Sequence, residues 1–111
     1  ISREQYADAK AQQTDFQQQL STQLRQNQVL WVIPTTPSGP PALTMSGEAL
    51  ASYRSDLMGL TSIAGLCGFP QLHLPMQGLS EGPCGISLMG QADQEALIFA
   101  AARRLYQGER K

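Results

Sequence analysis

The chain has 111 residues, which is enough for one domain with a modest hydrophobic core. Eight basic and nine acidic residues give a formal net charge of −1, and the scattered positive side chains form no stripe that would bind nucleic-acid phosphates. The longest apolar run, residues 29–33, is far too short for a membrane-spanning helix, so we expect a soluble protein without nucleic-acid or membrane partners.

The first 27 residues have the apolar spacing of a long amphipathic helix. Apolar side chains recur every three or four residues at Tyr6, Ala9, Phe16, Leu20 and Leu24. Ser2 followed by Gln5 is a capping box that starts the helix. Because the helix begins at once after Ile1, we expect a piece of a longer protein, with a processed start as the alternative.

Residues 29–33 form a continuous β-prone run, which predicts a strand covered on both faces in the interior of a sheet. The proline-rich residues 34–41 end this strand, since proline lacks a donor and restricts the residue before it. A loop at the carboxyl end of a strand is where α/β proteins place ligands. A polyproline docking segment or a plain connector remains an equal alternative.

The second half of the chain predicts a helix, two strands and a final helix. The helix begins at Ser46 or Gly47 and ends between Gly65 and Gly68. Strands are predicted at residues 69–76 and 85–89, joined by a turn at residues 78–82. The final helix carries Leu97, Ile98, Ala101 and Leu105 toward the core. The predicted order is therefore helix, strand, helix, strand, strand, helix.

The chain shows no complete active site of its own. Its single histidine, His73, lies between two leucines of a predicted strand, where a surface or hydrogen-bonded role is expected. There is no serine triad motif, and His73, Cys67 and Cys84 lack the paired spacing of zinc ligands. We therefore predict no catalytic residue, no metal site and no cofactor. The two cysteines are expected as thiols in a reducing compartment, which favours a cytoplasmic location, with one bridge between them left open.

Three segments together resemble a known enzyme family. They are residues 29–37 (VLWVIPTTP), residues 62–75 (SIAGLCGFPQLHLP) and residues 85–90 (GISLMG), followed by a helix with Asp93, Glu95 and Leu97. In this order they resemble the C-terminal part of an amidase-signature enzyme, and the resemblance covers nearly the whole chain. The Ser62-Ile-Ala-Gly form is similar to the indole-3-acetamide-type amidase branch and its noncatalytic import-receptor relatives. The chain departs from many members by having Leu66 and Cys67 where they carry an asparagine.

The resemblance implies a fold and a division of labour. Residues 1–111 are expected as a single C-terminal segment of an α/β/α sandwich with a mixed sheet. The family's serine nucleophile, its cis-serine relay and its lysine base belong to a central region that this chain does not contain, so no catalytic residue is carried over. Lining of the acyl pocket is expected from Met58, Thr61 and Ser62, with Thr35 and Thr36 near its rim. Ordinary helix packing is the alternative role for each of them.

These observations lead to two functional hypotheses. In the first, the chain is a fragment of an amidase that hydrolyses a carboxylic amide to acid and ammonia, and is inactive alone. Its partners are then the remainder of the amidase chain and a small amide substrate. In the second, it belongs to a noncatalytic protein-interaction module with an amidase-like fold. In either case the isolated chain is expected to expose apolar surface and to self-associate.

Overall fold

The computed structural model describes residues 1–27, 29–76, 78, 80 and 82–110. The helices are α1 (Arg3–Asn27), α2 (Gly47–Cys67) and α3 (Glu95–Arg110), and the strands are β1 (Trp31–Pro34), β2 (Gln71–Met76) and β3 (Cys84–Met89). This confirms the predicted α/β class and the predicted order of elements. The predicted turn at residues 78–82 includes residues 79 and 81, which lie outside the described residues.

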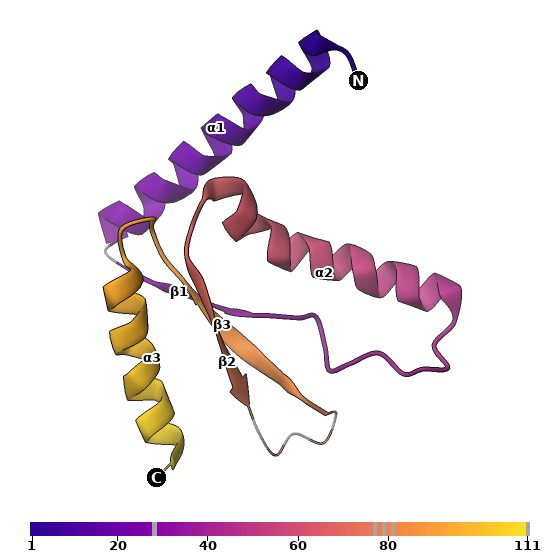
Figure 1. Cartoon of the computed structure of the whole chain (residues 1–111), viewed down its shortest axis with the longest axis vertical. Helices are drawn as coiled ribbons and strands as arrows, with labels where there is room; N and C mark the ends of the chain where they lie inside the picture. The colour runs from indigo at the N-terminus through magenta and orange to yellow at the C-terminus, as the bar shows by residue number, and fades with distance from the viewer. Residues whose placement is uncertain (28, 77, 79, 81, 111) are drawn as a thin grey trace.

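The strands form one antiparallel sheet in the order β1-β3-β2, with β3 in the centre (Figure 1). Both pairings among the described strands are antiparallel, so the mixed sheet that the resemblance implies would need strands from outside this chain. Within the described sheet β1 is an edge strand, so this chain's own strands do not provide the interior position predicted for residues 29–33. The side chain of Val32 on β1 is 60% exposed. An unbroken apolar run does not reveal an edge strand, because the side chains report the faces of a sheet and not its neighbouring strands.

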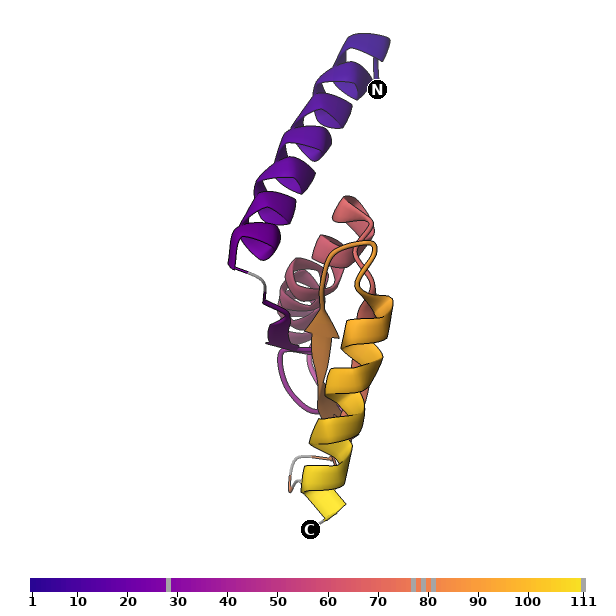
Figure 2. The same ribbon diagram turned by 90° about the vertical axis from the view of Figure 1, so that its left-hand side faces the viewer.

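Helices lie on both faces of the sheet, so the chain forms a three-layer α/β/α arrangement (Figures 1 and 2). On one face, α1 and α2 enclose a core of four buried residues: Leu24, Cys67, Phe69 and Met89. On the other face, α3 packs on the sheet through three buried residues: Leu88, Ile98 and Ala102. The predicted inward positions on α3 are thus confirmed for Ile98 and for Ala101, which packs against this cluster, and are wrong for Leu97 and Leu105, which are exposed.

Helix α1 begins with the predicted capping box. The Ser2 N–H donates to Gln5 Oε1 (2.8 Å), and the Gln5 N–H donates to Ser2 Oγ (3.1 Å). Glutamines of α1 also bind the end of α2: Gln13 Nε2 donates to the Leu66 carbonyl (2.9 Å) and Gln17 Nε2 to the Cys67 carbonyl (2.8 Å). The last carbonyls of a helix lack partners within it, so these glutamine side chains satisfy them and dock the two helices.

Helix α2 is bounded by two local caps. The Ser46 Oγ accepts a hydrogen bond from the Ala49 N–H (3.1 Å) at its start. Gly68 ends it in the left-handed conformation, with φ 69°, which glycine adopts without steric cost. None of the described helices is both long and apolar enough to cross a bilayer.

The two cysteines are free thiols, so the structure does not join them by the bridge that the sequence left open. Cys67 is buried in the core, and this burial raises the pKa of its thiol because the charged thiolate is poorly solvated there. Cys84 lies at the start of β3 and is half-buried.

The raised pKa of Cys67 predicts a loss of stability in alkaline solution. The stabilisation from a neutral Cys67 is complete below the pKa of an unfolded thiol, about 8.5, and is lost as the pH rises from there through the higher folded-state value. Urea unfolding at increasing pH is therefore expected to show a steeper alkaline loss for the natural chain than for Cys67→Ala. Cys84→Ala is the matched control and keeps the steep profile; identical profiles for all three chains would refute this assignment.

The described chain is broad and thin. Its principal extents are 51 × 41 × 16 Å, and its radius of gyration is 16.9 Å, whereas a compact domain of this length has about 13 Å. The first turns of α1 extend away from the rest of the molecule (Figures 1 and 2). Large apolar side chains are exposed on all three helices, among them Tyr6, Phe16, Met58, Phe99 and Leu105. Such an apolar surface is typical of a part that packs against further protein.

We predict that the 111-residue chain on its own self-associates, because association covers this exposed apolar surface. Light scattering after size-exclusion chromatography should give a mass above 12.1 kDa that increases with concentration. A mass of 12.1 kDa at every concentration would contradict the prediction.

Candidate functional site

The register of the sheet brings three polar side chains together on the face that carries α2. His73 of β2 and Ile33 of β1 both pair with Ser87 of β3. Thr35 directly follows β1, and its N–H donates to the Gly85 carbonyl (3.4 Å), which continues the pairing beyond the strand. Alternate residues of a strand face the same side of a sheet, so Thr35, Ser87 and His73 come together.

These three side chains form a hydrogen-bonded chain. Thr35 Oγ1 lies 2.6 Å from Ser87 Oγ and 2.7 Å from His73 Nδ1. Ser87 is 0% exposed, whereas His73 is exposed. The hydrogen bonds therefore run from Ser87 in the protein interior through Thr35 to the imidazole of His73 at the surface. We refer to these three residues, named in sequence order, as the Thr35–His73–Ser87 chain.

The Thr35–His73–Ser87 chain lies at a cavity of about 480 Å³, a size typical of small-molecule sites. Its lining comes from the proline-rich loop after β1, from Tyr53 of α2, and from β2, β3 and the residue before β3. The described lining residues are Thr35, Thr36, Ser38, Pro40, Pro41, Tyr53, His73, Pro75, Met76, Pro83, Cys84 and Gly85. None of these residues carries an acidic side chain, a lysine or an arginine.

Two hydroxyl groups of the loop at this cavity donate hydrogen bonds to carbonyl oxygens of the same loop. Thr36 Oγ1 donates to the Ser38 carbonyl (2.7 Å), and Ser38 Oγ donates to the Gly39 carbonyl (3.1 Å). Both bonds hold the segment between prolines in one conformation. The other polar side chains of the described lining are those of Thr35, Tyr53, His73 and Cys84.

The structure places the predicted pocket residues in two groups. Thr35 and Thr36 line the cavity, as described above. Met58, Thr61 and Ser62 lie on α2, but they are not among the residues that line it. Met58 is 63% exposed, and Thr61 Oγ1 donates to the Leu57 carbonyl one turn earlier (3.0 Å). A substrate-binding role for these five residues stays a prediction.

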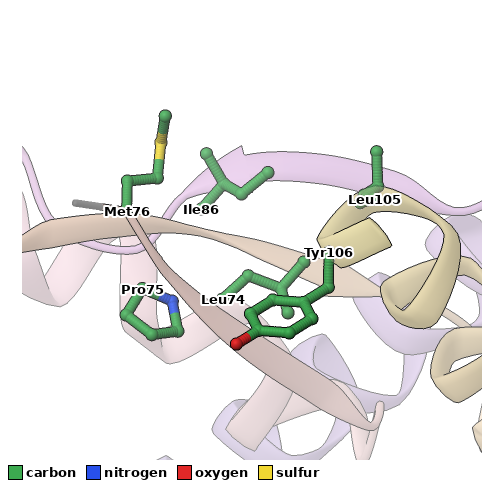
Figure 3. Close-up of a pocket in the computed structure, with 6 residues that line it drawn as sticks. All are labelled: Leu74, Pro75, Met76, Ile86, Leu105 and Tyr106. Carbon is green, nitrogen blue, oxygen red and sulfur yellow. The ribbon is translucent and has the colours of Figure 1, made fainter. Parts of the chain in front are cut away.

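A second, smaller cavity of about 280 Å³ lies on the opposite face of the sheet. Figure 3 shows its lining between the strands and the end of α3: Leu74, Pro75, Met76, Ile86, Leu105 and Tyr106. Five of these side chains are apolar, so this cavity offers shape and apolar contact with little polar chemistry. Within the described residues, no three His, Cys, Asp or Glu side chains are grouped as metal ligands.

The sequence did not reveal that His73 lines the first cavity, or that His73 and Ser87 both lie within hydrogen-bond distance of Thr35. It placed His73 on a strand with a surface or hydrogen-bonded role, and the bond to Thr35 agrees with that interpretation. The partners of His73 are 38 and 14 residues away in the sequence, so only the strand register reveals the group. Polar residues at alternate positions of two predicted neighbouring strands are the signal that would have indicated it.

Comparison with known proteins gives three informative similarities. The chain is 33% identical over 101 residues to a protein named Amidase 1 from Oryza sativa subsp. japonica, covering 90% of this chain and 23% of that protein. It is 42% identical over 82 residues to Amidase 1 from Arabidopsis thaliana, covering 73% of this chain and 19% of that protein. It is 36% identical over 69 residues to a fatty acid amide hydrolase from Arabidopsis thaliana, covering 61% of this chain and 11% of that protein.

The chain thus spans less than a quarter of the length of each of these relatives. No protein-family model matches it.

Proposed function

We propose that the chain is the C-terminal segment of an amide-hydrolysing enzyme of the amidase-signature family, whose membership these similarities support. The observation that carries the proposal is the similarity to the rice Amidase 1, which extends over 90% of the chain. The element order and the α/β/α layers agree with what the sequence resemblance implies for this part of the fold.

In this proposal the reacting groups lie in another part of the enzyme. A serine hydroxyl attacks the amide carbonyl, a cis-serine relays the proton, and a lysine acts as the base, while backbone amides stabilise the negative oxygen that develops. Acid and ammonia are the products. This chain then contributes sheet and pocket lining, and alone it has no activity.

The surface of the chain supports a role as one part of a larger body. Apolar side chains of α1 and α2 are exposed, and β1 is an edge of the described sheet. A protein that leaves an apolar strand at a sheet edge normally pairs or covers it. We propose that the preceding part of the enzyme does so, and that Met58, Thr61 and Ser62 then face the acyl group of the substrate.

We propose further that the enzyme belongs to the indole-3-acetamide-type branch and acts in the cytoplasm. The Ser62-Ile-Ala-Gly sequence and the free thiols motivate these two finer assignments. The alternative is a noncatalytic interaction module that keeps the same fold.

A chimera tests the proposal directly. The matched segment of the rice Amidase 1 is replaced by the corresponding residues of this chain, and ammonia release is measured from indole-3-acetamide and from a long-chain fatty acid amide. We expect release by the chimera, with indole-3-acetamide preferred, and none by the rice protein lacking the segment. A folded chimera that releases no ammonia from either amide would count against the enzyme and favour the interaction module.

A further inference from the structure

We propose that the cavity at the Thr35–His73–Ser87 chain binds a small, neutral, largely apolar compound through its carbonyl oxygen, with the Nε2–H of His73 as the donor. The inference rests on the proposed function only for the choice of an amide as that compound, and it concerns binding at this cavity, apart from the reacting groups and from the acyl contacts proposed for Met58, Thr61 and Ser62. It gives His73, which neither the sequence nor the similarities single out, a role in recognising the ligand.

The burial of Ser87 determines which hydroxyl donates in its hydrogen bond with Thr35. Ser87 is completely buried, so its hydroxyl proton needs an acceptor within the protein. Among the described residues its side-chain partner is Thr35 Oγ1, and no buried side-chain polar atom there lacks a partner. Either hydroxyl could be the donor in this contact, but only donation by Ser87 gives its buried proton an acceptor among the described side chains, so we infer that Ser87 donates to Thr35.

The hydroxyl of Thr35 determines the tautomer of the His73 imidazole. Thr35 has one hydroxyl proton, and with Ser87 donating to its oxygen, that proton is free to go to His73 Nδ1 at 2.7 Å. Nδ1 is then an acceptor, and in a neutral imidazole the proton resides on Nε2. The hydroxyl pair thus presets His73 as a hydrogen-bond donor.

The imidazole ring of His73 is positioned by its contact with Gly85 of β3. A Cβ atom at Gly85 would lie only 2.6 Å from Cε1 and 3.0 Å from Nε2 of His73. The absence of a side chain at Gly85 therefore allows the imidazole to lie against β3. Nδ1 is held by Thr35, and Cε1 and Nε2 lie close to Gly85 of β3, so the ring is held in one position; because His73 lines the cavity, we infer that a ligand there reaches its Nε2–H.

The chemistry of the cavity lining indicates which class of ligand it binds. The described lining has no acidic, lysine or arginine side chain to pair with an ion, and its prolines, Tyr53 and Met76 offer mainly apolar contact, which favours a neutral compound. The hydroxyls of Thr36 and Ser38 are already donated to loop carbonyls. A compound with an apolar body and a carbonyl oxygen fits this lining, so a neutral carboxamide should bind better than the carboxylate that its hydrolysis yields.

His73 is the only histidine, so its nitrogen signals in the chain need no assignment. The experiment is magic-angle-spinning NMR of sedimented, ¹⁵N-histidine-labelled chain in mildly alkaline buffer, which does not require a monomeric sample. We expect a bare Nδ1 and a protonated Nε2. On addition of benzamide labelled with ¹³C in its carbonyl group, we expect a dipolar coupling between that carbon and Nε2, and a weaker effect with benzoate.

Substitutions separate the donor from its support. His73→Phe keeps a ring but lacks the donor, so benzamide should bind about fivefold more weakly, the effect of one net hydrogen bond. His73→Gln retains an N–H and should recover most of that loss. Thr35→Val should give a mixture of tautomers, whereas Thr35→Ser keeps the single tautomer. Thr14→Val, which removes an exposed hydroxyl on α1, is the control and should change nothing.

The results overturn the inference if Nδ1 carries the proton in the natural chain, or if benzamide shows no coupling to Nε2 in both the natural chain and Thr35→Ser. They also overturn it if benzoate binds as well as benzamide. Binding at His73 together with an inactive chimera would reject the proposed function alone. An active chimera whose affinity for benzamide is unchanged by His73→Phe would reject the binding site alone.

Discussion

Leu24→Ala is expected to lower the free energy of unfolding by about 2–5 kcal/mol and to detach α1 from the body of the chain. Leu24 is 0% exposed and is the α1 residue in the buried cluster with Cys67, Phe69 and Met89. Truncation removes apolar contacts and leaves a cavity at the point where the helix meets the sheet. Urea unfolding followed by circular dichroism gives the loss of stability, and hydrogen exchange gives the loss of protection in α1.

A change at the other end of the same helix is the control. Tyr6 is 55% exposed on the part of α1 that extends away from the sheet, so Tyr6→Ala is expected to change stability by less than about 0.5 kcal/mol. It should leave the exchange of the last turns of α1 unaltered. Equal losses for Leu24→Ala and Tyr6→Ala would show that α1 is not anchored through the described core.

The helices could be predicted closely because their ends depend on neighbouring residues. The reciprocal bonds of Ser2 and Gln5, the Ser46 cap and the left-handed Gly68 are all short-range features that the sequence displays directly. The place of β1 in the sheet could not be predicted in the same way. Strand order depends on pairings between distant segments, and the apolar run of β1 describes only how its faces prefer to be covered.

The candidate site shows the same division. The resemblance implied that Thr35 and Thr36 lie near the rim of an acyl pocket; both line the larger cavity, and their role in substrate binding stays a prediction. His73 and Ser87 gain their meaning only from the register that sets them level across β2 and β3. A hydrogen bond over 52 residues, such as that of Thr35 with Ser87, leaves no periodic trace in the sequence.

Gly85→Ala is expected to destabilise the chain by about 3 kcal/mol, at the upper end of the cost of overpacking. The added Cβ would collide with the Leu74 carbonyl oxygen of β2 and would lie 2.6 Å from Cε1 of His73. Because backbone is one of the two obstacles, a side-chain rotation alone cannot relieve the contact, and β2 and β3 must move apart. Urea unfolding measures the loss of stability, and the histidine NMR signals report the displaced ring.

Gly59→Ala is the matched control, with the same added methyl group at a site where no atom lies within 4 Å of the new Cβ. Gly59 lies inside α2, and alanine is favoured over glycine in a helix by about 0.5–1 kcal/mol, so this change should stabilise the chain. The two substitutions therefore have opposite expected signs. If Gly85→Ala changes neither the stability nor the His73 signals, then the Leu74 carbonyl and the His73 ring do not lie close to Gly85. The fixed ring position from which we inferred the tautomer of His73 is then wrong.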